Sequence, residues 1–309
     1  MQAAIHLDLD GATDIFRVHG WSYRGETDPL FETGLRNALD FFDQNQVRAT
    51  LFVIAQDLTD ARKRKLLEEA MRRGHQIGSH SVTHRRLTRL SREDKTDEIF
   101  GSRDRLASAL GIEVPGFRAP GFHIDRESLE LIAAAGYRYD SSTFPNAASA
   151  RKIGLTSLGP FPSHPLAGCD LIEFCLPDYA GLPFSFHPCF SLILGTPYFR
   201  LGFRRFVKRH RAGAAPAEPG NSAGLAATGP VVPRLSGKRR APMILLFHLT
   251  DFADPLPSSY LPGWKARLYT LSHLSAIHKR TACSQMLQLV RDRFEIVDTA
   301  ALLPEVTIN

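Results

Sequence analysis

The chain has few cysteines, and no two of the four, Cys169, Cys175, Cys189 and Cys283, form a C-x-x-C pair. This spacing excludes a structural zinc site built on cysteine pairs. A disulfide within residues 169–189 is compatible with the sequence, but free buried thiols are the simpler expectation.

The sequence also lacks a run of about 18 apolar residues, so we expect no membrane-spanning helix. It starts with a strand pattern, without a basic start or an apolar stretch, so we expect no secretory signal and a cytoplasmic location. The net charge of +6 is spread along the chain and no nucleic-acid-binding motif accompanies it. We therefore expect no nucleic-acid partner.

Segments with strand and helix patterns alternate along most of the chain. The strands are predicted at residues 4–10, 49–54, 75–80, 116–118, 137–140, 243–248 and 294–297. The helices are predicted at about residues 31–44, 59–73, 91–110, 125–135 and 269–292, with a polar loop at 11–29. This order predicts an α/β fold, a distorted (β/α)7-type barrel whose site lies at the carboxyl ends of its strands.

The alternation breaks at residues 146–241, which we interpret as an insertion before the last barrel strands of a single domain, 1–309. Residues 212–241 are rich in Ala, Gly and Pro and contain little to bury, so we expect this part to be flexible.

Two polar motifs stand at predicted strand ends. In the first strand, Asp8 and Asp10 alternate with apolar residues, so both carboxylates share one face. His80 and His84 follow the third strand, and a spacing of four would bring both rings to one side of a turn or helix. Two imidazoles and a carboxylate can bind a divalent metal and leave positions open for water and substrate, which predicts a catalytic site. The alternatives are an edge strand with outward polar residues and a chance histidine pair.

These motifs, followed in order by Arg-Ala-Pro-Gly-Phe at residues 118–122, resemble the NodB-type polysaccharide deacetylases, carbohydrate esterase family 4. The resemblance covers residues 4–145 and resumes at 242–297.

Carried over by position, the resemblance implies that Asp10, His80 and His84 are the metal ligands and that Asp8 is the catalytic base. Arg118 is implied as the partner of this base, keeping the carboxylate ionised and orienting it with its planar fork. The implied cofactor is one divalent ion, zinc in the first instance, with Fe, Co, Mn and Ni as alternatives.

The resemblance also implies that His248, at the end of a strand, is the general acid that protonates the departing amine. Asp140 and Glu173 are both candidates to orient it. The oxyanion of the reaction is expected to meet the metal and the backbone N–H of Gly121 or Phe122.

The form Asp-Leu-Asp, followed by Phe16-Arg17, looks nearer the intracellular branch that includes undecaprenyl-linked formamido-arabinose deformylases. We therefore expect removal of an acetyl or formyl group from an N-acylated amino sugar that is lipid-linked, nucleotide-linked or part of a small intracellular glycan. The alternatives are an extracellular polysaccharide or peptidoglycan N-deacetylase, an iron oxygenase and a non-catalytic glycan-binding protein.

Residues 184–211 combine aromatic and aliphatic side chains with a basic cluster. Such a composition suits either a lid that contacts an anionic membrane peripherally or a helix that covers the barrel with a solvated basic face.

Overall fold

The computed structural model describes residues 1–179, 182–212 and 241–303. The strands that build the main sheet are β1 (Gln2–Asp8), β2 (Ala49–Val53), β3 (Gln76–Ser79), β4 (Gly116–Phe117), β5 (Tyr139–Asp140), β6 (Ile172–Glu173), β9 (Met243–His248) and β10 (Glu295–Ile296). The α-helices are α1 (Ala12–Val18), α2 (Pro29–Gln44), α3 (Ala61–Arg72), α4 (Arg92–Leu110), α5 (Arg126–Ala134), α6 (Ala147–Lys152), α7 (Pro188–Leu194), α8 (Thr196–Ala212), α9 (Trp264–Tyr269), α10 (Ala276–Arg291) and α11 (Thr299–Leu302).

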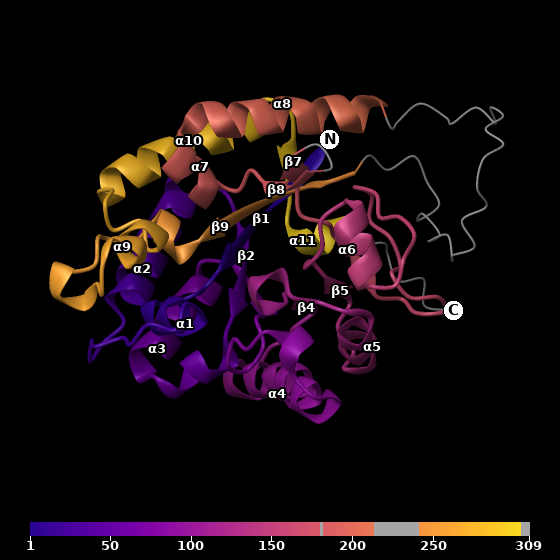
Figure 1. Cartoon of the computed structure of the whole chain (residues 1–309), viewed down its shortest axis with the longest axis horizontal. Coiled ribbons are helices and arrows are strands. Elements are labelled where there is room, and N and C mark those ends of the chain that lie inside the picture. Colours follow the sequence, from indigo (N-terminus) through magenta and orange to yellow (C-terminus); the bar gives the residue numbers. More distant parts are fainter. Residues whose placement is uncertain (180–181, 213–240, 304–309) are drawn as a thin grey trace.

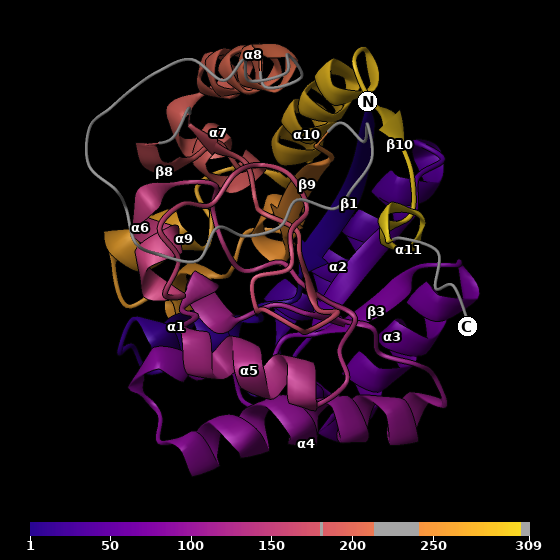
Figure 2. The same cartoon turned by 90° about the vertical axis from the view of Figure 1, so that its right-hand side faces the viewer.

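All neighbouring strands of the main sheet run parallel. From β1 the sheet continues through β2, β3, β4 and β5 to β6, while β9 pairs with the other side of β1. The short β10 pairs with the start of β1. The sheet curls into a half-barrel with helices around it (Figures 1 and 2), which confirms the expected distorted (β/α)7 barrel.

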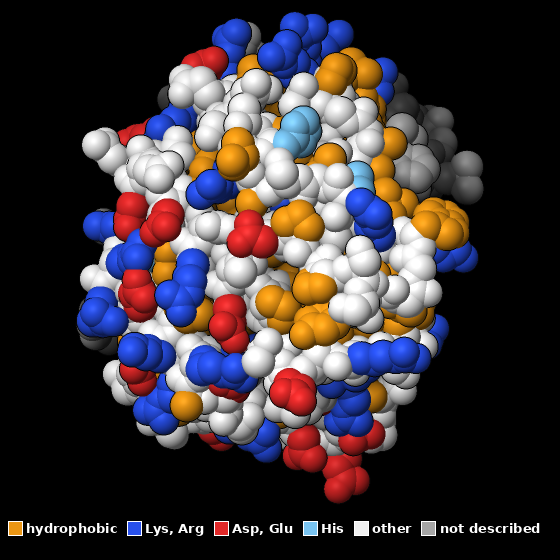
Figure 3. All heavy atoms as spheres, turned by 90° about the vertical axis from the view of Figure 1, so that its left-hand side faces the viewer, with side chains coloured by type: hydrophobic (Ala, Val, Ile, Leu, Met, Phe, Trp, Pro, Cys, Tyr) orange, Lys and Arg blue, Asp and Glu red, His pale blue; other side chains and the backbone are white. Residues whose placement is uncertain are grey.

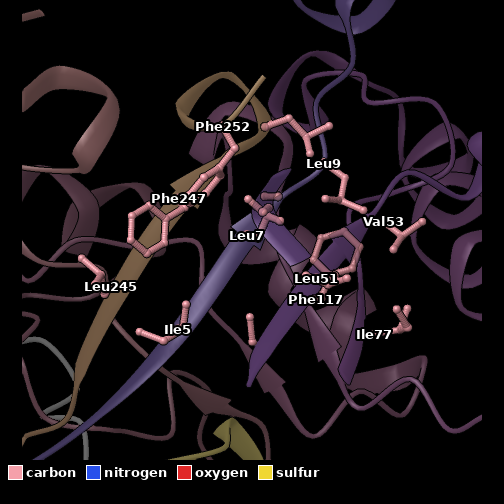
Figure 4. Packing of buried hydrophobic residues seen from close by; sticks show 14 of the residues in the cluster. Ile5, Leu7, Leu9, Leu51, Val53, Ile77, Phe117, Leu245, Phe247 and Phe252 are labelled. Atoms are coloured by element: carbon pink, nitrogen blue, oxygen red, sulfur yellow. The ribbon is translucent and has the colours of Figure 1, made fainter. Parts of the chain in front are cut away.

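The two faces of the strands bury different sets of side chains. Leu7, Leu51 and Phe247 point outward and pack under the surrounding helices (Figure 4). Phe52 and Leu246, on the opposite face, fill the interior of the half-barrel. Because β1 is buried on both faces, the alternative of a solvated edge strand is wrong.

Local sequence signals explain where several helices begin. Asp28 accepts a hydrogen bond from Phe31 N (3.0 Å) before α2, and Ser91 accepts one from Asp94 N (3.1 Å) before α4. The predicted polar loop at residues 11–29 is wrong in its first part, where α1 forms. Asp28 also accepts a hydrogen bond from Ala12 N (3.0 Å). A residue beyond the end of α1 therefore provides the acceptor for a backbone N–H in the first turn of this helix.

The predicted insertion contains one strand of the main sheet, β6, which pairs with β5. The antiparallel pair β7 (Asp178–Tyr179) and β8 (Leu182–Ser185), then α7 and α8, follow it. The segment predicted to be flexible, 212–241, lies outside the described residues except at its two ends.

Most apolar side chains of α7 and α8 pack inward rather than toward a membrane. Leu192, Phe199, Phe203 and Phe206 are buried. The exposed apolar side chains of these helices are Phe190, Ile193, Leu194 and Leu201. Within the described ranges no helix has both the length and the apolar character needed to cross a membrane. The inward packing favours a helix that covers the barrel, and the predicted membrane contact is not supported.

The short helix α11 closes the amino end of the half-barrel. Leu302 and Leu303 belong to the interior cluster, and Thr299 Oγ1 lies 2.8 Å from Thr50 Oγ1 and 3.1 Å from His6 Nε2. All four cysteines are free thiols.

Candidate active site

The predicted site residues gather at the carboxyl ends of the sheet strands. Asp8 is the last residue of β1, and His248 is the last residue of β9. His80 directly follows β3, and Arg118 directly follows β4. Since β1, β2, β3 and β4 are consecutive neighbours and β9 pairs with β1, these ends meet on one edge of the half-barrel.

Asp10, His80 and His84 form a compact cluster whose ligand atoms all lie within 4.8 Å of one another. Asp10 Oδ1 lies 3.2 Å from His80 Nε2 and 3.1 Å from His84 Nε2. Burial would raise the pKa of Asp10, but the two histidines lower it well below its usual range. The structure therefore brings together the three residues predicted to be metal ligands.

The donor atoms of this cluster fit a cation. His80 Nδ1 lies 2.8 Å from the carbonyl oxygen of Arg118, which can only accept, so His80 carries its proton on Nδ1. Its Nε2 lone pair then faces Asp10 Oδ1. Asp10 Oδ1 and His84 Nε2 are buried without a hydrogen-bond partner among the described residues. A buried carboxylate oxygen beside imidazole nitrogens that lack other partners is an arrangement that a divalent ion stabilises.

The loop that carries His80 and His84 is not helical, contrary to one of the expected arrangements. Ser81 and His84 have φ angles of 67° and 57°, in the left-handed region that residues other than glycine rarely adopt. Glu98 of α4 holds this loop by accepting hydrogen bonds from Val82 N (2.9 Å), Thr83 N (2.8 Å) and Thr83 Oγ1. Anchoring by α4, rather than helical spacing, brings the two rings to the same place.

Asp8 lies between two cationic or protonatable groups. Its Oδ2 is 4.0 Å from Arg118 Nη1 and 3.9 Å from His248 Nε2, and its Oδ1 is buried without a hydrogen-bond partner in the described structure. Arg118 therefore forms the expected ion pair with Asp8, but 4.0 Å is too long for the hydrogen bonds of a forked contact.

Arg118 instead uses its Nη2 for other partners. This nitrogen donates to His6 Nδ1 (2.7 Å) and to Ser141 Oγ (3.3 Å), while the guanidinium lies 4.6 Å from the centre of the Phe52 ring. Burial and the charge of Arg118 lower the pKa of His6, which is therefore neutral. His6 must carry its proton on Nε2 and donate it to Thr299. His6 was not among the predicted site residues, although it shares the strand face of the two aspartates.

A second carboxylate near His248 belongs to Asp251, which was not predicted from the sequence either. Asp251 Oδ2 accepts a hydrogen bond from His248 N (2.9 Å). Among the described residues, neither Asp140 nor Glu173 forms a hydrogen bond or ion pair with His248. A carboxylate three residues beyond a strand-ending histidine was the available signal, because it can cap the turn that follows.

Asp140 and Glu173 face each other from register positions on β5 and β6, which explains why they do not reach His248 on β9. Glu173 Oε1 accepts hydrogen bonds from Thr143 N (3.0 Å) and Thr143 Oγ1 (2.7 Å), and Asp140 Oδ1 accepts one from Ser142 Oγ (2.7 Å). Burial and the neighbouring Glu173 raise the pKa of Asp140 well above its usual range. This pair fixes the loop after β5 rather than the general-acid candidate.

The insertion contributes one unexpected side chain, His187, at the start of α7. Its ring stacks on that of His248 with centroids 6.2 Å apart, and both of its nitrogens are buried without a hydrogen-bond partner in the described residues. Burial, then the charges of His248 and Arg118, lower its pKa well below the usual range. Nothing in the local sequence distinguishes this histidine, because its place depends on how the insertion folds back over the barrel.

Gly121 and Phe122 both have positive φ angles, 58° and 60°. Phe122 N donates to the carbonyl oxygen of Ala119 (2.9 Å), so its N–H is not free for an oxyanion. Of the two predicted donors, Gly121 is the one that remains.

Sequence comparisons point to one family. Residues 25–139, which include His80, His84 and Arg118, match the family model described as polysaccharide deacetylase. A peptidoglycan deacetylase from Helicobacter pylori (strain ATCC 700392 / 26695) is 28% identical over 144 residues, 43% of this chain and 48% of that protein. Both matches show similarity to polysaccharide deacetylases over less than half of the chain. The chain spans about half the length of the curated relative it matches. The narrower likeness to the intracellular deformylase branch is not confirmed by these matches.

Solved structures share the fold at low sequence identity. A Mycobacterium smegmatis protein assigned as a polysaccharide deacetylase has a TM-score of 0.58 and 14% identity, covering 98% of this chain and 88% of that one. The Puue allantoinase has a TM-score of 0.59 and 12% identity with the same two coverages. At these identities the likeness shows the fold alone, and proteins named for different activities share it.

Proposed function

We propose that this protein is a metal-dependent hydrolase that removes an N-acetyl group from an amino sugar of a glycan. The observation that carries the proposal is the metal-binding geometry of Asp10, His80 and His84 next to Asp8 and His248. Three protein ligands leave coordination positions open, which distinguishes a catalytic site from a structural one.

The metal would be held by Asp10 Oδ1, His80 Nε2 and His84 Nε2, which lie within 4.8 Å of one another. A divalent ion bound there supplies Lewis-acid chemistry, making water more acidic and polarising an acyl carbonyl. Zinc suits two imidazoles and one carboxylate, and Fe, Co, Mn and Ni suit the same ligands.

The remaining site residues transfer protons or stabilise charge during the reaction. Asp8 accepts the proton of the attacking water through its unpartnered Oδ1, and the nearby Arg118 stabilises its negative charge. His248 Nε2 donates a proton to the departing amine nitrogen when the C–N bond breaks. The N–H of Gly121 supplies a hydrogen bond to the oxyanion. Asp251 positions the backbone of His248.

The choice of an N-acetylated glycan as substrate rests on the polysaccharide deacetylase match and on the peptidoglycan deacetylase relative. A second candidate is deacylation of a lipid-linked or nucleotide-linked amino sugar, including deformylation. It rests on the Asp-Leu-Asp form of the first motif and on the Phe16-Arg17 pair that follows it.

The test is a substrate panel. Protein loaded with one metal at a time is incubated with N-acetyl and N-formyl amino sugars that are free, oligomeric, nucleotide-linked or lipid-linked, and released acetate and formate are measured. We expect acetate from N-acetylglucosamine oligomers, with the Asp8→Asn variant as the negative control. Formate from a lipid-linked sugar alone would select the second candidate. Absence of both acids, from every substrate and metal, would contradict both.

A further inference from the structure

Four aromatic side chains, His19, Trp21, Trp264 and Tyr269, lie together outside the barrel, and we call them the aromatic platform. The rings of His19 and Trp21 stack with centroids 4.6 Å apart and 21° between their planes. Tyr269 lies 4.3 Å from His19 and 6.0 Å from Trp21. Trp21 and Trp264 line the same surface hollow of about 190 Å³, with Lys265 at its side.

The platform is open to solvent although its members are large. The side chain of Trp264 is 71% exposed and that of Tyr269 is 53% exposed, while Trp21 is half-buried against Phe16. A single exposed aromatic residue needs no explanation, but two tryptophans that line one hollow, with His19 and Tyr269 beside them, mark a binding surface. Figure 3 shows hydrophobic side chains gathered on the face of the molecule to which α1 and α9 belong.

The connectivity places this platform beside the candidate active site. Its two halves follow β1 and β9, the adjacent strands whose ends carry Asp8 and His248. The seven residues of α1, about 10 Å of helix, separate the region of Asp10 from His19.

The chemistry of the platform suits sugar rings. A pyranose presents C–H groups on its faces, which the electron-rich face of an aromatic ring attracts, and hydroxyl groups at its edge, which need polar partners. Trp21 and Trp264 offer the ring faces, and His19 and Lys265 offer polar atoms. A bilayer would not fill a hollow, and the strongly basic surface lies on α8, at the top of Figure 3, rather than here.

We propose that the aromatic platform binds sugar residues of the glycan that neighbour the one losing its acyl group. This inference rests on the proposed function and deepens it, because it assigns an oligomeric substrate to the site. A platform about one helix length from Asp10 cannot be reached by a single amino sugar bound at the metal, but it can be reached by an oligomer.

Intrinsic fluorescence reports on this surface directly, because Trp21 and Trp264 are the two tryptophans of the full sequence. The full-length Asp8→Asn variant, in which turnover should be largely suppressed, is titrated with the N-acetylglucosamine tetramer and, separately, with the monomer. We expect the tetramer to change the emission and the monomer to have little effect. Adding Trp264→Ala should weaken tetramer binding about tenfold, the change expected for one lost stacking contact, with Trp21 as the remaining reporter.

Matched variants separate a lost contact from a lost fold. Trp264→Phe keeps a ring and should restore most of the affinity, whereas Leu201→Ala removes an exposed apolar side chain on α8 and should change nothing. Acetate release by the wild-type protein is measured in parallel. Acetate release from the tetramer without any tetramer-induced emission change would overturn the platform and leave the proposed function standing. An emission change without acetate release would support the platform and contradict the proposed function. Emission changes with anionic vesicles but not with the tetramer would show that the platform meets a membrane, and the proposal would be wrong.

Discussion

Asp8 Oδ2 lies 3.9 Å from His248 Nε2, and the two residues are register partners on the adjacent parallel strands β1 and β9. The proposed base and the proposed acid are therefore positioned by a ladder of backbone hydrogen bonds in the core rather than by surface loops. The strands keep this spacing fixed, so each side chain can be replaced without displacing the other.

We expect Asp8→Asn and His248→Ala each to lower kcat by about 10²- to 10⁴-fold, the usual effect of removing a general base or acid. Neither residue belongs to the metal-binding cluster, so both variants should bind metal like the wild type. Steady-state rates at saturating metal, combined with metal analysis of the purified variants, check the prediction. A near-wild-type rate for either variant would show that its role is assigned wrongly.

Metal content should depend on the residues of the cluster and not on histidine in general. His84→Ala and Asp10→Ala should each lose most bound metal, because two protein ligands hold a divalent ion poorly. His278→Ala, which removes an exposed histidine on α10, is the matched control and should keep it. Metal per protein after dialysis is the measurement, and retention of a full equivalent by His84→Ala would remove His84 from the site.

Glu98 should tune metal affinity without touching the ion. It accepts hydrogen bonds from Val82 N and Thr83 N and so supports the left-handed conformation of His84. Glu98→Ala should weaken metal binding about 10- to 100-fold, the range seen when residues that orient a metal ligand are removed. Glu98→Gln keeps an accepting oxygen and should lose less. Competition with a chelating dye measures both, and equal affinities for wild type and Glu98→Ala would contradict the anchoring role.

The free energy of unfolding should depend on pH because of Asp251. Burial raises the pKa of Asp251 to about 6. The charge of His248, the hydrogen bond from the backbone N–H of His248 and the charge of Lys279 lower this pKa by smaller amounts. The folded protein therefore binds this proton more tightly than the unfolded chain does. The free energy of unfolding should then fall as pH rises from about 4 to about 6, by about 3 kcal/mol from this group.

The Asp251→Asn side chain keeps an oxygen that can accept from His248 N, but it cannot ionise. The free energy of unfolding of this variant should therefore lack the decrease between about pH 4 and 6. Urea unfolding of both proteins at several pH values between 4 and 7 gives the difference, from which other titrating groups cancel. Parallel stability curves would show that Asp251 does not titrate in this range.

Much of the fold could be predicted from the sequence, because β1, β2 and β9 are long enough to show an apolar strand pattern. The helices α2, α4 and α5 begin within two residues of their predicted starts. Two elements, β6 and α1, were not predicted because their local sequence carries no clear signal. β6 has two residues, too few to show a period, and α1 is capped by Asp28, which lies far beyond the end of that helix.

The sequence predicts the site residues that directly follow strand ends. It does not predict hydrogen-bond partners that are determined by tertiary packing. Asp10, His80 and His84 converge as expected. The partner of Arg118 could not be read from the sequence, because His6 and Asp8 lie on the same strand face and only the packed interior decides between them. His187 depends on the path of α7 over the barrel, which no local pattern encodes.

The helix α11, which closes the amino end of the half-barrel, has a consequence for the arginine beside Asp8. Thr299 Oγ1 receives the His6 proton, and that proton position leaves His6 Nδ1 free to accept from Arg118. The tautomer of one buried imidazole therefore links the docking of a four-residue helix to the placement of the guanidinium, on the side of the barrel opposite that helix.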